Sequence, residues 1–150
     1  MQTRATAVIA PYAPGRFFAL PPVCSVAVLD EFTPIEVPAA PYYCNSLLRW
    51  QQQLLPVLDL ASLIRALPAA QIGRRYVLVA AYQVREFAPI QHGALMIADL
   101  PQMIPVTDAD ASALPNDSDI WPEISVSCFR HDGMPVPILD PALLFARQLS

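Results

Sequence analysis

The sequence predicts a mainly β fold made of two similar halves, each a meander of about five strands with a short helix. Two internal repeats support this prediction: residues 55–64 are similar to residues 136–145 at an offset of 81, and residues 93–98 are similar to residues 15–20 at an offset of 78. The 17 prolines, with only 4 glycines, are the third observation. Because proline lacks an amide donor, such a composition favours the short, bent strands of small barrels.

The composition limits the possible classes of protein. A chain of 150 residues that is 55% hydrophobic and 15% charged forms one domain, or two subdomains sharing a core, with apolar surface left over. A net charge of -4 argues against nucleic-acid binding. The longest uncharged stretch, residues 17–29, is shorter than the roughly 18 residues that span a bilayer. Because the first residues also make a poor signal peptide, we expect a cytoplasmic protein without membrane insertion.

In the first half, apolar and β-branched runs predict short strands. They lie at residues 6–9, 16–20, 23–29, 47–50 and 54–58. A turn is expected at residues 12–15, and the last two strands form a hairpin around residues 51–53, which are all glutamine. Residues 30–43 contain three prolines and are expected to form an irregular connection.

The second half is predicted in the same way. Its strands are expected at residues 75–84, 94–98, 103–107, 124–130 and 134–139. Residues 92–93, His-Gly, are predicted to be a turn, and residues 131–133 contain the Asp-Gly signal of a hairpin turn. Residues 108–123 are expected to be a polar loop.

Each half ends in a strand, an aspartate and a helix. Asp59 and Asp140 are predicted N-caps, because a carboxylate accepts hydrogen bonds from the unpaired amides of a first helical turn. The helices are expected at residues 61–67 and 141–149. Pro141 suits the first helical position, where its missing amide costs nothing.

Motifs for catalysis or metal binding are not found. The chain has three cysteines, which are far apart and lack CxxC spacing. This pattern favours buried reduced thiols over a disulfide framework or a zinc site. They are Cys24, Cys44 and Cys128. His92 and His131 carry no catalytic motif, and the acidic pairs at 108/110 and 117/119 lack the glycine and bidentate glutamate of a calcium loop. We therefore expect no enzyme activity, cofactor or metal.

Four segments in order resemble the CheW-like domain of bacterial chemosensory adaptors, over essentially the whole chain. They are GRFFALPPVCSVAVL (15–29), PIEVPAAPYYCNSLLRWQQQLLPVLDLASLI (34–64), GALMIADLPQMIPV (93–106) and ISVSCFRHDGMPVPILDPALLF (124–145). Each is similar to a family pattern, and their order and spacing make the resemblance specific.

The resemblance implies a single CheW-like domain over residues 1–150 with two five-stranded, SH3-like β-barrels. Subdomain 1 would cover about 16–73 plus the chain termini, and subdomain 2 about 74–140, with an open hydrophobic groove between them. It also implies a non-enzymatic adaptor that binds the regulatory domain of a CheA-type histidine kinase, itself CheW-like, and the cytoplasmic tip of a chemoreceptor. Such an adaptor would lie at receptor arrays or the cell pole.

The chain departs from the family pattern at three places. The family's Arg-Gly turn falls on Gln51 and Gln52, its earlier glycine falls on Ser46, and the acid after the valine of the second strand falls on Ser25. Because an arginine holds a carboxylate bidentately and a glutamine does not, an ion pair at this turn must be lost or remade. We therefore expect a divergent adaptor, similar to the accessory CheW-like proteins of pilus-linked (twitching motility) systems such as ChpC.

Eight residues are candidate partner-binding residues. They are Val23, Ser25, Arg49, Trp50, Gln51, Gln52, Leu54 and Asp99. Other interpretations stay open for some of them: Trp50 could pack in the core, Arg49 could share a structural role with its repeat partner Arg130, and Asp99 could stabilise a turn. At the level of the whole protein, the alternatives are a scaffold for a different protein and a barrel that binds a small molecule or lipid in a closed pocket.

Overall fold

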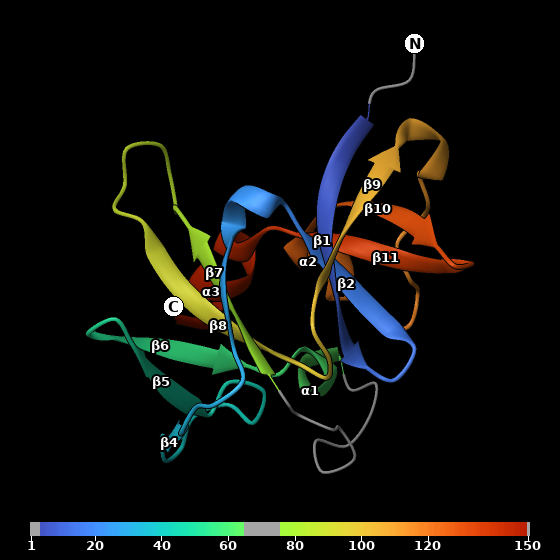
Figure 1. Ribbon diagram of the computed structural model, residues 1–150. Coiled ribbons are helices and arrows are strands. Elements are labelled where there is room, and N and C mark those ends of the chain that lie inside the picture. Colours follow the sequence, from blue (N-terminus) through green and yellow to red (C-terminus); the bar gives the residue numbers. More distant parts are fainter. Residues whose placement is uncertain (1–3, 65–75, 150) are drawn as a thin grey trace.

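The computed structural model describes residues 4–64 and 76–149 and contains two curled β-sheets with short helices (Figure 1). Sheet A consists of β1 (Arg4–Ala13), β2 (Arg16–Leu20), β9 (Gln102–Thr107), β10 (Ser125–His131) and β11 (Met134–Leu139). Sheet B consists of β3 (Ser25–Leu29), β4 (Ile35–Glu36), β5 (Ser46–Trp50), β6 (Gln53–Leu58), β7 (Tyr76–Tyr82) and β8 (Gln91–Ile97). The predicted mainly β fold is confirmed.

The two sheets have the same topology. In each sheet, one strand of a hairpin pairs in parallel with one strand of a second hairpin, and a fifth strand pairs antiparallel with the other strand of the second hairpin. The strand order is β10-β11-β2-β1-β9 in sheet A and β5-β6-β8-β7-β3 in sheet B, where β4 is added at the β5 edge. The offset of 81 relates β6 to β11, and the offset of 78 relates β8 to β2. Both internal repeats of the sequence therefore correspond to equivalent strands of the two sheets.

The chain enters sheet A, leaves it to build sheet B, and then returns. The hairpin β1–β2 comes first in the chain, whereas its counterpart β7–β8 follows β6, so the order of strands in sheet A is permuted relative to sheet B. The predicted subdomain limits, about 16–73 with the termini and about 74–140, thus divide the chain differently from the sheets. Repeat signals locate equivalent strands, but they do not say which strands pair.

Successive residues of the strands serve two different cores, because side chains alternate across a sheet. Ala19 lies in the interior of sheet A, whereas its neighbours Phe18 and Leu20 belong to a central cluster between the sheets. In sheet B, Val57 lies in the interior and Leu58 in the central cluster. Both faces of these strands are therefore buried, as their nearly continuous apolar runs indicate.

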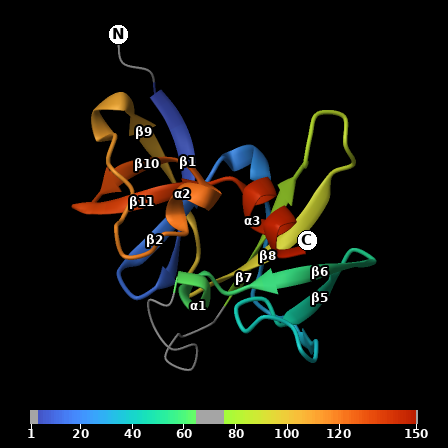
Figure 2. The ribbon, with the colours of Figure 1, turned by 180° about the vertical axis from the view of Figure 1, so that it is seen from behind.

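Each sheet is covered by the helix that follows a strand of the other sheet (Figure 2). Helix α3 (Pro141–Leu149) follows β11 of sheet A, yet its Phe145 ring stacks on Tyr82 of sheet B at a centroid distance of 5.6 Å. Helix α1 (Leu60–Ile64) follows β6 of sheet B and contacts β1 of sheet A. The short α2 (Trp121–Ile124) adds Trp121, which is fully buried, to the central cluster. These helices close most of the seam that we expected to be open.

Both predicted N-cap residues directly precede a helix, and the contact of an N-cap carboxylate with a backbone amide is seen for Asp140. Asp140 accepts a hydrogen bond on Oδ1 from the amide of Ala142 at 2.9 Å, as an N-cap does. The carbonyl of Asp59 accepts from the amide of Leu63 at 3.1 Å, and its carboxylate accepts from the Ser62 hydroxyl at 2.9 Å. Helix α1 is described only to Ile64, so the predicted continuation to residue 67 lies outside the described residues.

Several expected elements differ from those observed. The turn predicted at His92 and Gly93 is wrong, because both residues lie inside β8. Val23 lies in a 3-10 turn, η1 (Pro22–Cys24), ahead of β3. The predicted polar loop holds a second 3-10 turn, η3 (Asp108–Asp110), and α2. Its Asp117 accepts from the indole Nε1 of Trp121 at 2.7 Å and forms an ion pair with Arg16, which ties the loop to sheet A.

Candidate partner-binding surfaces

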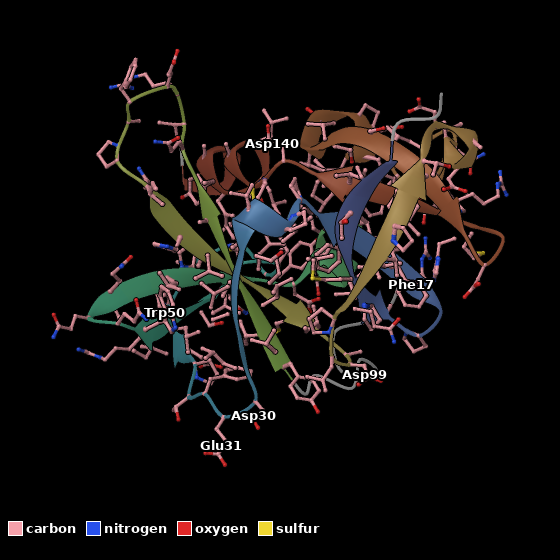
Figure 3. All side chains as sticks on the ribbon, turned by 45° about the horizontal axis from the view of Figure 1, so that its top comes forward. Phe17, Asp30, Glu31, Trp50, Asp99 and Asp140 are labelled. Atoms are coloured by element: carbon pink, nitrogen blue, oxygen red, sulfur yellow. The ribbon has the colours of Figure 1, made fainter. Side chains whose placement is uncertain are left out.

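The candidate residues fall on two separate surfaces and a turn. Five of them lie on the β5–β6 hairpin, which we call the hairpin end of sheet B: Arg49, Trp50, Gln51, Gln52 and Leu54. Ser25 lies on β3, just after the exposed Val23 of η1, and Asp99 lies in the connection between β8 and β9. Figure 3 shows Trp50 and Asp99 well apart, so the candidates do not form one site.

The hairpin turn has a strained backbone. Gln51 and Gln52 have φ values of 48° and 64°, so both are in the left-handed region. Two residues with positive φ define a type I′ turn, which favours asparagine or glycine. Both glutamine side chains are exposed. Gln53, which we expected in the turn, is the first residue of β6.

Trp50 is a surface residue that packs on a neighbouring strand. Its ring lies 5.1 Å from that of His92 on β8, and His92 Nδ1 lies 3.3 Å from Oε1 of Gln53. Trp50 is half-buried, so it does not belong to the core. Leu54 and Arg49, paired across the hairpin, are exposed. The hairpin end therefore offers a partly covered aromatic ring beside an exposed leucine.

The two arginines at equivalent repeat positions do not show the same contacts. Arg130 donates from Nη1 to the carbonyl of Gly133 at 3.2 Å, across the β10–β11 turn. Arg49 has the equivalent place on β5, beside a turn of the same kind. Arg130 therefore has a structural role, since it binds a backbone carbonyl across the turn, whereas a partner-binding role for Arg49 stays a prediction.

The second surface is an apolar groove between β3 of sheet B and β9 of sheet A, which we call the β3–β9 groove. Its volume is about 220 Å³, and it opens to solvent. It is lined by Val8, Ser25, Val26, Ala27, Val28, Leu78, Pro101, Gln102 and Met103. Val26, Val28 and Met103 are exposed, with 64% of Met103 accessible. This is where the expected seam between the sheets is open.

Both strands beside the groove have an unpaired edge. Within the described chain, β3 pairs only with β7, and β9 pairs only with β1. The Ser25 hydroxyl is buried and has no hydrogen-bond partner among the described residues, next to a bulge between Ser25 and Ala27. An edge strand presents its amides and carbonyls to whatever docks beside it. The groove thus combines apolar side chains with unsatisfied polar groups.

Acidic residues lie beyond the end of the groove (Figure 3). Asp30 and Glu31 follow β3 and are exposed, and Asp99 follows β8 at the same end of sheet B. Asp99 accepts on Oδ1 from the amide of Leu100 at 2.8 Å, which is the turn-stabilising contact. A partner contact of Asp99 stays a prediction.

Sequence reasoning missed the apolar members of the groove and of one loop. Val26 and Val28 could have been found, since alternation along β3 places them on one face, opposite Ala27. The exposure of Met103 follows from the edge position of β9, which no local pattern indicates. Phe87, in the loop between β7 and β8, is the most exposed large apolar residue described.

Three further features of the described residues concern metal ligands, thiols and membrane spans. No group of three or more histidine, cysteine or acidic side chains in the described part of the chain is placed to hold a metal ion. Burial raises the pKa of the thiols of Cys24, Cys44 and Cys128, which disfavours the reactive thiolate. None of the helices in the described ranges is long and apolar enough to cross a membrane.

Comparison with known proteins agrees with this fold. The family model of the CheW-like domain matches residues 14–149. Among solved structures, the scaffolding protein TtCheW from Thermoanaerobacter tengcongensis is similar, with a TM-score of 0.73 and 12% sequence identity, over 92% of this chain and 90% of that chain. At this identity the likeness shows the fold alone. No curated protein matches the chain.

Proposed function

This chain belongs to the CheW-like domain family, and on that premise we propose that it is a non-enzymatic adaptor that couples chemoreceptors to a CheA-type histidine kinase. Proteins of this family are scaffolds of chemotaxis signalling. An adaptor needs two docking surfaces that can be occupied together. The β3–β9 groove and the hairpin end of sheet B lie near opposite edges of sheet B, which supports this proposal.

The observation that carries the proposal is the β3–β9 groove. Contiguous exposed apolar side chains mark binding sites, and an amphipathic helix binds such a groove through apolar residues spaced three and four apart. The cytoplasmic tip of a chemoreceptor is a helical hairpin of this kind. Val26, Val28 and Met103 would contact its apolar face.

The hairpin end of sheet B is the proposed docking surface for the kinase regulatory domain. Trp50 and Leu54 provide the apolar contact, since tryptophan is enriched among the residues that dominate binding energy. Gln51 and Gln52 cannot form the bidentate ion pair of an arginine, so binding here depends more on apolar contact. This difference supports a place among accessory adaptors, such as those of pilus-linked (twitching motility) systems.

Three matched substitutions test the two surfaces separately. Met103→Asp places a charge in the β3–β9 groove, Leu54→Asp places one at the hairpin end, and Val126→Asp is the control on β10, where 61% of the valine is exposed. We expect Met103→Asp to weaken binding of a receptor-tip fragment by about tenfold or more, with little change in binding of the kinase regulatory domain, and Leu54→Asp to do the reverse. Isothermal titration calorimetry measures both.

The control Val126→Asp should bind both partners as the wild type does. If the wild type fails to bind either one of the two partners, the regulatory domain or the receptor tip, at micromolar concentrations, the adaptor function is wrong. If all three variants bind alike, the two surfaces are wrongly assigned. Restoring Arg-Gly at positions 51 and 52 without any gain in kinase binding would favour a scaffold for a different protein. A fluorescent fusion that gathers at receptor arrays or the cell pole would support the proposed cytoplasmic location.

A barrel that binds a small molecule or lipid is less well supported. The interiors of both sheets are filled by their own side chains. A cavity of about 490 Å³ beside Phe17, Asp99 and His131 is open to solvent and lined by both polar and apolar groups. It is therefore not the closed, dry pocket that such a function predicts.

A further inference from the structure

The loop that joins β7 to β8, residues 83–90, projects away from the rest of the molecule (Figure 1). Three of its apolar side chains are exposed: Val84, Phe87 and Ile90. Phe87 is 92% exposed. Single exposed apolar residues are ordinary, but three in one projecting loop are what a docking element presents.

The conformation of this loop is fixed by its own contacts. The Gln83 side chain donates from Nε2 to the carbonyl of Ala88 at 2.8 Å, and the amide of Ala88 donates to the carbonyl of Arg85 at 3.1 Å. The side chain of Ala88 is buried. At the base of the loop, the Tyr82 hydroxyl donates to Oε1 of Gln91 at 3.0 Å. The loop is thus held in place without any contribution from the Phe87 ring.

Phe87 has a strained backbone as well as an exposed ring. Its φ of 66° lies in the left-handed region, which costs an L-residue with a bulky side chain about 1 kcal/mol or more. Burial of the ring does not offset this cost, because the ring lies in solvent. A rigid loop that holds an aromatic ring outward is pre-organised for binding, since little side-chain and loop entropy is lost when it docks.

The loop is continuous with the hairpin end of sheet B. Strands β6 and β8 are parallel neighbours, with Val57 opposite Ala94, so they begin at the same end of the sheet. His92, near the start of β8, contacts the Trp50 ring and the Gln53 side chain. The β5–β6 hairpin and the β7–β8 loop therefore border one surface.

We propose that the β7–β8 loop is part of the kinase-binding surface and that Phe87 is its anchor, entering an apolar pocket of the CheW-like regulatory domain. Arg85 and Glu86, both exposed beside Phe87, would face charges of opposite sign at the rim of that pocket. The Phe87 anchor would compensate for the arginine–carboxylate ion pair that Gln51 and Gln52 cannot form with the kinase. This inference rests on the proposed function, because it names a further residue for the same partner.

Substitution of Phe87 by asparagine separates binding from folding. Asparagine tolerates a positive φ, so Phe87→Asn keeps the loop conformation and removes the ring. We expect the Kd for the purified kinase regulatory domain to rise by about tenfold or more, as for a central aromatic anchor. The Tm should be unchanged or higher, because the strain is relieved. Val126→Asn on β10 is the control for loss of an exposed apolar side chain, and its Kd should equal that of the wild type.

The outcomes distinguish failure of the proposed adaptor function from failure of the proposed role of Phe87. A wild type that does not bind the regulatory domain overturns both. Binding that Leu54→Asp weakens and Phe87→Asn leaves unchanged overturns the role of Phe87 alone. If Phe87→Asn lowers the Tm as well as the affinity, Phe87 has a structural role, and its proposed role as a binding anchor is also overturned. Gln83→Ala, which removes the hydrogen bond to Ala88, should raise the Kd by a smaller factor, because the loop is then less ordered in the free protein.

Discussion

At the scale of single residues, the β5–β6 turn is a place where side chain and backbone are poorly matched. Gln51 and Gln52 occupy the two positions of a type I′ turn at which glycine or asparagine is favoured. The equivalent turn between β10 and β11 is formed by Asp132 and Gly133, with φ values of 51° and 78°. The repeat therefore keeps the turn geometry while only one copy has the favoured residue.

We expect Gln52→Gly to stabilise the protein by about 0.5–1 kcal/mol, because glycine adopts a positive φ without the strain that an L side chain brings. Urea denaturation, with the free energy of unfolding extrapolated to water, measures the change. Gln53→Gly is the matched control: this residue lies in β6, where glycine should destabilise by a similar amount. Equal effects of the two substitutions would contradict the assignment of strain to the turn.

At the scale of elements, the packing of α3 on sheet B depends on one close approach. A Cβ atom added at Gly93 of β8 would lie 2.5 Å from the ring of Phe145. Glycine is needed here for space, since the residue has no positive φ. The ring, which is fully buried, also stacks on Tyr82. A single glycine thus allows the helix that follows sheet A to lie against sheet B.

Gly93→Ala should destabilise the protein by about 1–3 kcal/mol, as overpacking of a buried site does. Phe145→Leu, which shortens the side chain, should destabilise through lost packing. The double variant should be less destabilised than the sum of the two, because the smaller side chain makes room for the added methyl group. Thermal denaturation of the four proteins gives the coupling, and strict additivity would show that the two residues do not contact.

The same elements show what the sequence could and could not predict. Strands 16–20 and 134–139 and helix 141–149 have the predicted bounds, because local pattern and an N-cap determine them. The turn predicted at His92 and Gly93 failed because the glycine is required by Phe145, more than fifty residues later in the chain. For the candidate surfaces, the hairpin residues were predicted together. The β3–β9 groove and Phe87 could not be predicted fully, since they depend on which strands form the edges and how a loop folds.

At the scale of the whole molecule, the two sheets depend on each other. Sheet A takes strands from both ends of the chain, and the helices α1 and α3 each cover the opposite sheet. The central cluster contains side chains from both sheets and from helices α1, α2 and α3. Neither sheet has an independent core large enough to be a domain by itself.

Fragments 1–73 and 74–150, cut at the predicted boundary between the subdomains, should therefore both fail to fold. The first lacks β7 and β8, which lie between β3 and β6, and the second lacks β1 and β2, which lie between β9 and β11. Circular dichroism during thermal denaturation should show no cooperative transition for either fragment alone. A cooperative transition in one fragment would mean that the halves are independent domains.

The path of the chain also orders events during translation. Hairpin β1–β2 is synthesised before the described strands of sheet B, but its neighbours β9 and β11 are synthesised only after them. Sheet B can assemble earlier, although Phe145 reaches it with the final helix. Until then both edges of the nascent hairpin stay unpaired and prone to aggregation, and the late long-range pairing makes folding slow.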